Sequence, residues 1–212
     1  MLLLGLDTAT PSVTVAVCDD ARVLSESAAP DDRRHGERLA PAIEAVLRDA
    51  GLTSSDLGAI AVGVGPGPFT GLRVGLVTAR MLGAVLKVPV HGVCTLDALA
   101  LAAGIAGSFR VATDARRKEV YWAAYDGSAG LVRVDGPHVS RPAEVSWDGP
   151  VVGPAAQLYP DDFPDGREPL RPSGAAICRW VADGHPSLQP VPLYLRRPDA
   201  TEPSPRKPVL GR

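Results

Sequence analysis

Two glycines and two prolines alternate at positions 65–68, directly after an apolar run, and this stretch restricts the fold more than any other. Residues 59–64 are rich in small and β-branched residues and are bounded by glycine, which predicts a buried strand. Glycine permits positive φ, and proline fixes φ and lacks an N–H, so residues 65–68 form a rigid loop outside helix and sheet. Thr70 can cap a helix, and the proline-free stretch 71–87 predicts a long one.

The helix expected over residues 70–87 is apolar around most of its circumference, whereas a helix packed on one sheet needs only one apolar stripe. Small residues recur at every fourth position and form a ridge along one face. The ridge packs between layers of its own domain, or against a helix of another chain, or does both, since small residues let two backbones approach closely. For contact with another chain we predict an interface of six residues: Gly71, Leu72, Gly75, Leu76, Ala79 and Gly83.

The bulk composition excludes several classes of partner. The 212 residues carry 22 basic and 24 acidic side chains, a formal net charge of −2, which gives no electrostatic basis for unaided binding to nucleic acid or acidic membranes. Three widely spaced cysteines match no metal site and fit a reducing compartment. The N-terminus lacks the basic flank of a signal peptide, and no apolar run reaches the ~20 residues of a membrane span. We expect a soluble, cytoplasmic protein.

The two halves of the sequence repeat one pattern. Asp7 ends an apolar strand and Asp19 follows 12 residues later, after an alternating strand; Asp114 and Asp126 repeat this spacing 107 residues downstream. The repeat predicts two lobes of related topology, although strand–turn–strand patterns also recur by chance.

We place the N-terminal lobe in residues 1–103 and a second lobe in residues 104–196. Fifteen of the 21 prolines lie from Pro137 onward, so regular elements there must be short and the second lobe reduced. One helix is predicted over 173–183, with a serine cap. Residues 197–212 are proline-rich and polar, and we expect them to be disordered.

The glycine-rich loop lacks the residues of a nucleotide-binding loop. A P-loop places Lys-Ser or Lys-Thr after its last glycine, whereas Leu72 and Arg73 follow Gly71. The dinucleotide fingerprint lacks its third glycine whether it starts at Gly63 or Gly65. We therefore predict a structural role for this loop.

Polar residues at the end of the first strand are the candidate cofactor site. Asp7, Thr8 and Thr10 place a carboxylate and two hydroxyls where they could meet a nucleotide phosphate or its Mg²⁺; the alternative is that Asp7 only caps a turn. No metal pair is formed at the start of the next helix, because Leu39 stands four residues after His35. We find no catalytic set of nucleophile and base.

Four segments together resemble the TsaB (YeaZ) family. The resemblance covers residues 1–126 well and the remainder poorly, and the glycine–proline motif is its strongest part. The segments are Leu4-Gly5-Leu6-Asp7-Thr8-Ala9-Thr10, Gly65-Pro66-Gly67-Pro68-Phe69-Thr70-Gly71-Leu72-Arg73-Val74-Gly75, Asp114-Ala115-Arg116-Arg117-Lys118-Glu119-Val120-Tyr121 and Tyr194-Leu195-Arg196.

The resemblance implies an α/β protein of the actin-like ATPase (ASKHA) fold, with two lobes of duplicated βββαβα topology. It also implies a role in forming threonylcarbamoyladenosine (t6A) at adenosine 37 of tRNA, where a TsaB-like subunit pairs with its paralogue TsaD, the transferase, and an ATPase, TsaE, drives turnover. TsaD carries a His-x-x-x-His metal motif, of which this chain has only His35. The reduced second lobe is expected to be too small to close a nucleotide cleft.

The sequence and the resemblance together predict a non-catalytic dimerisation subunit that lacks an intrinsic cofactor and meets tRNA only through the complex. A homodimer of the chain alone, and a nucleotide at a shared subunit interface, stay open. Two other functions also stay open. One is an autonomous ATP-binding, kinase-like enzyme of the same fold, and the other is a glycoprotease-type peptidase, for which the sequence offers no residues.

Overall fold

The first half of the chain forms a five-stranded sheet around its first strand. In the computed structural model, which describes residues 1–29 and 35–196, the strands are β1 (Leu2–Asp7), β2 (Val13–Asp19), β3 (Arg22–Ala29), β4 (Ala59–Gly65) and β5 (Val90–Cys94). Their order is β3-β2-β1-β4-β5. β1 to β3 pair antiparallel, and β1, β4 and β5 pair parallel. β4 is buried along its whole length, as expected for a strand covered on both faces.

The second half repeats this topology on a smaller scale. Its strands are β6 (Ser108–Asp114), β7 (Val120–Asp126), β8 (Val132–Ser140), β9 (Val151–Val152) and β10 (Gly166–Arg167), in the order β10-β9-β6-β7-β8. β6 to β8 pair antiparallel and β6, β9 and β10 pair parallel, as in the first sheet. The predicted duplication is therefore confirmed, with β6 in the place of β1.

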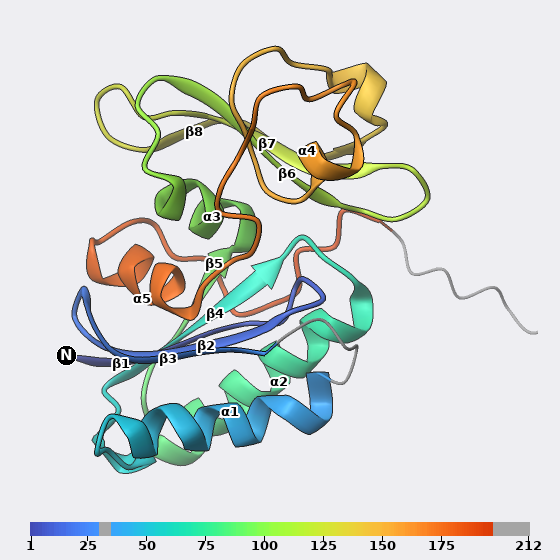
Figure 1. Ribbon diagram of the computed structural model, residues 1–212. Helices are drawn as coiled ribbons and strands as arrows, with labels where there is room; N and C mark the ends of the chain where they lie inside the picture. Colours follow the sequence, from blue (N-terminus) through green and yellow to red (C-terminus); the bar gives the residue numbers. More distant parts are fainter. Residues whose placement is uncertain (30–34, 197–212) are drawn as a thin grey trace, which may run out of the picture.

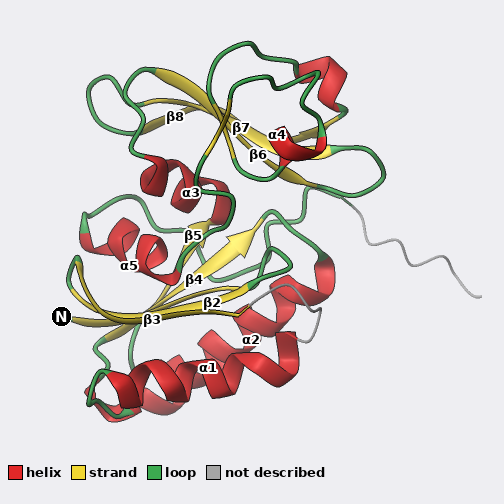
Figure 2. Cartoon of the chain, viewed as in Figure 1, coloured by secondary structure: helices red, strands yellow, loops and turns green. Residues whose placement is uncertain are grey.

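Helices cover the first sheet on both faces (Figures 1 and 2). α1 (His35–Asp49) and α2 (Phe69–Leu86) lie on one face, and α5 (Gly174–Ala182) packs on β1 and β2 from the other. The second lobe has only the 3₁₀ helix Pro142–Val145 and the four-residue α4 (Ala155–Leu158) at the positions of α1 and α2. The many prolines of the second half predicted short regular elements there, and the helices and parallel strands of the second lobe are indeed short.

The last helix of each half packs on the sheet of the other half. α3 (Thr95–Ala103) places Leu96 and Leu99 against Phe109 and Tyr125 of the second sheet. α5 places Cys178 against Leu3 of the first sheet, and its predicted serine cap is present, since Ser173 Oγ accepts from the N–H of Ala176 at 3.0 Å. The two cores therefore depend on each other.

The two sheets are separated near the predicted boundary between residues 103 and 104. The predicted second lobe, residues 104–196, does not form one unit in space, however. The sheet strands end before residue 104 in the first half and resume at Ser108. α5 and the chain after it return to the first lobe, where Leu188 pairs with Gly92 and the N–H of Leu193 donates to the carbonyl of Val64. Residues 104–196 are thus not one lobe. The predicted tail, 197–212, lies outside the described residues.

The small-residue ridge of α2 is buried in its own lobe, so the predicted six-residue partner interface is wrong. All six residues are buried. A Cβ at Gly75 would overlap with Thr8 Oγ1, and one at Gly83 would overlap with Val90 Cγ2. The glycines therefore let the helix lie close to β1 and β5. Thr70 is also not the N-cap, which is Pro68.

Ala79→Leu tests this correction. Ala79 is 0 % exposed, so three added carbons overpack the contact between α2 and the sheet, and we expect a loss of about 1–3 kcal/mol in the free energy of unfolding. Ala84→Leu is the matched control, because Ala84 is exposed on the same helix and leucine and alanine have similar helix propensities. Urea denaturation of the isolated chain measures both variants. Equal stability of the two would mean that the ridge does not pack inside the lobe.

Candidate functional site

The glycine–proline loop, residues 65–68, packs closely against the turn between β1 and β2. A Cβ at Gly67 would overlap with the carbonyl oxygen of Ala9, and one at Gly63 would overlap with Asp7 Oδ2. Gly65 has φ +98°, in the region that favours glycine. Each glycine thus has a packing or conformational role, which agrees with the structural role predicted for the loop.

Asp7 and Thr8, two of the three predicted cofactor residues, are occupied by contacts within the protein. Asp7 is 0 % exposed; its Oδ1 accepts from the N–H of Ala9 and its Oδ2 from Thr95 Oγ1, both at 2.7 Å. Thr8 Oγ1 donates to the carbonyl of Gly71 at 2.8 Å and accepts from the N–H of Gly75 at 3.1 Å. The two side chains connect β1 with α2 and α3 and line none of the cavities described below, so the turn-capping alternative for Asp7 is the one that the structure supports.

Burial dominates the electrostatics of Asp7. It raises the pKa of Asp7 to about 6, while the hydrogen bonds from Thr95 and Ala9 and the nearby His35 act in the opposite direction. The carboxyl group is held at the end of β1 because β1 is central and covered by helices on both faces. His35 itself lies beside Thr10, with Nε2 2.8 Å from its carbonyl oxygen. Across residues 1–29 and 35–196, no three His, Cys, Asp or Glu side chains gather as a metal site.

Thr10, the third predicted residue, lines two cavities between the lobes. The larger has a volume of about 310 Å³ and lies between the β1–β2 turn, the end of β6, α4 and the loop before α5. A second, of about 210 Å³, includes His35 and the start of α2. A third, of about 190 Å³, lies between the glycine–proline loop, the β6–β7 turn and residues 194–196. The reduced second lobe thus still forms cavities with the first lobe, of about 190–310 Å³ each; that it is too small to close a nucleotide cleft stays a prediction.

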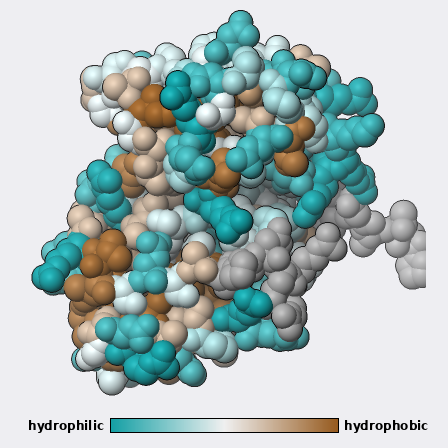
Figure 3. All heavy atoms as spheres, viewed as in Figure 1, coloured by the Kyte–Doolittle hydropathy of each residue, from teal (hydrophilic) through white to brown (hydrophobic). Residues whose placement is uncertain are grey.

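Pro68 and Arg116 line all three cavities, and we call the combined space the interlobe cleft. The cleft is basic: Arg116, Arg117, Arg171 and Arg196 line it, with Asp114 as the only carboxylate among its lining residues. Figure 3 shows hydrophilic residues at the edge of the second lobe, where the β6–β7 turn lies. The sequence analysis assigned no role to these arginines, because residues from four segments meet only in the folded chain.

The chain after α5 forms one wall of the cleft. Tyr194 stacks on Phe69, with ring centroids 5.1 Å apart, and its Oη accepts from Arg73 Nε at 3.0 Å. Arg73 also lies over the Phe69 ring, 3.7 Å from its centroid. Arg196 donates to the carbonyl of Ala115 at 2.8 Å and pairs with Glu119. Residues 194–196 therefore connect the start of α2 with the β6–β7 turn.

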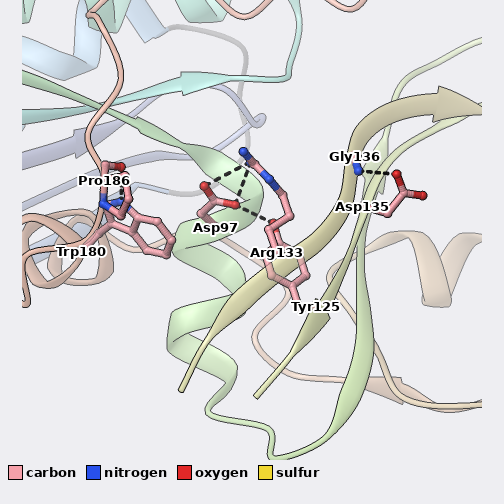
Figure 4. Close-up of polar contacts among 7 residues, drawn as sticks. All are labelled: Asp97, Tyr125, Arg133, Asp135, Gly136, Trp180 and Pro186. Atoms are coloured by element: carbon pink, nitrogen blue, oxygen red, sulfur yellow. Dashed lines mark hydrogen bonds and ion pairs between the residues drawn. The ribbon is translucent and has the colours of Figure 1, made fainter. Parts of the chain in front are cut away.

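An ion pair between the buried Asp97 and the partly buried Arg133 lies where α3 crosses the second sheet, and the sequence analysis did not find it (Figure 4). Arg133 Nη1 donates to Asp97 Oδ1 at 3.0 Å and Oδ2 at 3.2 Å, and Tyr125 Oη donates to Asp97 Oδ1 at 2.8 Å. Burial raises the pKa of Asp97, while Arg133 and Tyr125 act in the opposite direction. Tyr125, whose ring stacks on Phe109, is also buried, so the three side chains fix α3 on the second lobe.

The outer face of α2 is apolar and open to solvent. Val77, Met81 and Val85 are 57 %, 63 % and 73 % exposed, and Ala84 is exposed between them. We call these four residues the docking face. α2 is also long and apolar enough to cross a membrane by length and composition, but core helices of soluble proteins meet the same criterion, and its other face packs on the sheet.

Comparison with known proteins identifies the family. A family model described as TsaD, tRNA N6-adenosine threonylcarbamoyltransferase, matches residues 22–162. The tRNA threonylcarbamoyladenosine biosynthesis protein TsaB of Escherichia coli is 34 % identical over 175 residues, which cover 76 % of this chain and 74 % of that protein. The chain belongs to the TsaB (YeaZ) family. The solved structure of YeaZ from Pseudomonas aeruginosa agrees, with a TM-score of 0.78 at 29 % identity over 92 % of this chain and 99 % of that one.

A further relative of this chain is an uncharacterized protein of Mycobacterium tuberculosis, 46 % identical over 206 residues, which cover 93 % of each chain. The similarity thus extends well beyond residues 1–126, the part that the resemblance seen in the sequence covers well. The paired sheets are those of the actin-like ATPase fold, as expected of a TsaB. The candidate residues of this chain thus form two groups: Asp7 and Thr8 lie inside the protein, and Thr10 lines the interlobe cleft.

Proposed function

We propose that this chain is a non-catalytic subunit in t6A formation on tRNA and that it acts by pairing with a TsaD-type transferase. Membership of the TsaB family supports the pathway, since relatives named TsaB are described as tRNA threonylcarbamoyladenosine biosynthesis proteins. The observation that carries the pairing is the docking face, because exposed apolar side chains gathered on one face are typical of a protein–protein contact.

The docking face fits a helix of the partner. Val77, Met81, Ala84 and Val85 follow one side of α2 and are spaced as on a helix face that receives a second helix. Arg73 and Arg80 are exposed on the same side of α2, where they form the polar rim usual around an apolar contact. The partner therefore meets the side of α2 opposite to the small-residue ridge.

The state of Asp7 supports a non-catalytic role. A carboxylate that binds catalytic Mg²⁺ must reach the ion, whereas both oxygens of Asp7 accept hydrogen bonds inside the protein and the residue is 0 % exposed. We assign the transfer chemistry to the TsaD-type partner and the energy of turnover to a TsaE-type ATPase, with this chain meeting tRNA through the complex in the cytoplasm. An autonomous ATPase predicts instead that the chain alone releases phosphate from ATP.

Val77→Asp and Met81→Asp are expected to weaken binding to the TsaD-type transferase of the same organism by tenfold or more. Each variant buries an unpaired charge in the contact. A cost of about 1.4 kcal/mol already lowers the affinity tenfold. Val132→Asp is the matched control, because Val132 is 57 % exposed like Val77 and lies on β8 of the other lobe. Isothermal titration measures affinity, and mass spectrometry measures t6A in a reconstituted mixture with the ATPase.

Folded Val77→Asp and Met81→Asp variants that bind the transferase like the unchanged chain would refute the pairing through α2. Sedimentation of the chain alone tests whether the docking face instead joins two copies of this chain. If the unchanged chain is a homodimer, the two variants are monomeric and both still bind the transferase normally, the docking face belongs to the homodimer. A mixture that forms t6A at full rate without this chain would refute its role as a required subunit.

A further inference from the structure

The docking face continues toward the start of α2 as one row of side chains. Residues four positions apart are neighbours on the surface of a helix, and Phe69, Arg73, Val77, Met81 and Val85 have this spacing on α2. Arg73 is exposed, like the three residues that follow it in the row, and Phe69 is partly buried. On this side the docking face therefore continues into a guanidinium and an aromatic ring.

The chain after α5 adds a tyrosine to this end of the row. Tyr194 is 38 % exposed; its ring stacks on Phe69, and its Oη accepts from Arg73 Nε at 3.0 Å. We call Phe69, Arg73 and Tyr194 the Tyr194 cluster. Tyrosine and arginine are enriched among the residues that contribute most to protein–protein binding, since their rigid, planar groups lose little conformational entropy in a contact. The composition of the cluster is therefore that of a protein–protein contact.

Contacts on either side of Tyr194 along the chain hold it in this place. The residue before it is tied to the first sheet, because the N–H of Leu193 donates to a carbonyl of β4 at 2.8 Å. Arg196, two residues later, pairs with Glu119 in the β6–β7 turn of the second lobe. The tyrosine is thus positioned before any partner binds, which lowers the entropy cost of a contact with it.

The positive charge of Arg73 is not balanced by a neighbouring carboxylate. α2 contains no Asp or Glu. Within residues 1–29 and 35–196 the side chain of Arg73 contacts the Tyr194 hydroxyl and the Phe69 ring, neither of which carries a charge. Tyr194 occupies only Nε, so the two Nη groups keep the parallel N–H donors that match a carboxylate. The cluster therefore favours a partner surface that brings a carboxylate to Arg73.

We propose that the partner contact extends from the docking face onto the Tyr194 cluster, where a carboxylate of the partner pairs with Arg73. This extension rests on the pairing with a TsaD-type transferase proposed above, and it adds residues 194–196 and the charge of the partner surface to that contact. A partner helix along the row meets apolar side chains over most of its length and places an acidic side chain beside Arg73. The partner thus touches a segment that is anchored in both lobes.

Isothermal titration with the TsaD-type transferase of the same organism measures what Tyr194 contributes. Tyr194→Ala is expected to weaken binding about tenfold. Tyr194→Phe keeps the stacked ring, removes only the hydroxyl and should weaken binding about two- to fivefold; it decides the question if Tyr194→Ala does not fold. Leu188→Ala is the matched control and should bind like the unchanged chain, because Leu188 is 40 % exposed, belongs to the same segment and pairs with Gly92 of β5.

Arg73→Gln tests the predicted charge of the partner surface. It is expected to weaken binding about tenfold at low salt and clearly less at high salt, because salt screens the lost ion pair, whereas the loss in Tyr194→Ala should depend little on salt. Arg22→Gln is the control for the general effect of removing one positive charge, since Arg22 is exposed on β3. A loss in Arg73→Gln that is equal at both salt concentrations would overturn the partner carboxylate.

The same titrations distinguish failure of this extension from failure of the pairing. If Val77→Asp weakens binding while the folded Tyr194 and Arg73 variants bind like their controls, the pairing stands and its extension to the Tyr194 cluster is wrong. If all of these variants bind the transferase like the unchanged chain, both are wrong. If the Tyr194 and Arg73 variants lose only self-association of the chain, measured by sedimentation, the cluster belongs to a homodimer and the extension is likewise wrong.

Discussion

Arg133→Met is expected to destabilise the folded chain by about 3–5 kcal/mol, because it leaves the carboxylate of Asp97 buried without a cation. The side chains of Asp97 and Arg133 are 8 % and 29 % exposed, so water replaces the lost partner poorly. Methionine preserves most of the length and apolar contact of the arginine stem. For a chain of this size the melting temperature should fall by about 6–20 °C.

Two further variants distinguish this pair from an ordinary surface ion pair. Arg179→Met is the exposed control, since Arg179 and Asp183 pair at 3.2 Å with side chains 55 % and 35 % exposed, and such a pair contributes at most about 1 kcal/mol. Adding Asp97→Asn to Arg133→Met should recover much of the loss because it removes the buried charge. Urea denaturation that places Arg133→Met within about 1 kcal/mol of the unchanged chain would contradict the assignment.

The loss in Arg133→Met should also shrink as the pH falls from 7 to 5. Burial already raises the pKa of Asp97, and Arg133 is the largest influence that lowers it. Without Arg133 the folded-state pKa rises further, so protonation neutralises the buried carboxyl at a higher pH and removes the penalty. A loss that is constant over this range would indicate that packing of the arginine stem, not charge, accounts for it.

The strands and the repeat were predictable because their signals are local. Apolar runs that end at Asp7 and Asp114 mark the two central strands, and equal spacing to Asp19 and Asp126 marks the antiparallel partners. Strand pairing follows from this order along the chain, since short connections favour neighbouring strands. The serine cap of α5 is equally local. Each of these predictions depends on residues that are close in the sequence.

The predictions that failed depend on contacts between distant residues. Periodicity shows that α2 has more than one apolar face but not which face meets the sheet; contacts of Gly75 with Thr8 and of Gly83 with Val90 decide this. Thr70 was assigned as the N-cap, yet α2 begins at Phe69, whose ring stacks on Tyr194 far along the chain.

The candidate site was only partly predictable for the same reason. Asp97 and Arg133 are 36 residues apart and meet only because α3 crosses to the second sheet. The cleft likewise needs Thr10, Arg116 and Arg171, from three separate segments, to meet around one cavity. No spacing rule joins such residues, so composition and pattern name Thr10 as a candidate without showing what it faces.

Asp7→Asn is expected to stabilise the folded chain at pH 7 by up to about 3 kcal/mol. Burial raises the pKa of Asp7 from 3.8 to about 6 in the folded chain, so the folded state binds the proton more tightly than the unfolded state between these values. Stability therefore falls as pH rises from about 4 through 6, and the difference of about two pKa units amounts to about 3 kcal/mol at pH 7. Asparagine keeps the acceptor for the N–H of Ala9 and carries no charge, so it lacks this penalty.

The quantity to measure is the free energy of unfolding of Asp7→Asn minus that of the unchanged chain, from urea denaturation between pH 4 and pH 7. It should be positive at pH 7 and decrease toward pH 4, where the side chain at position 7 is neutral in the folded state of both proteins. Asp56→Asn is a control of opposite sign, because hydrogen bonds from Thr53 lower the pKa of Asp56, so its carboxylate stabilises the folded state at pH 7. A difference for Asp7→Asn that is negative at pH 7 and independent of pH would mean that the hydrogen bonds from Ala9 and Thr95 outweigh burial, and that folding does not raise the pKa of Asp7.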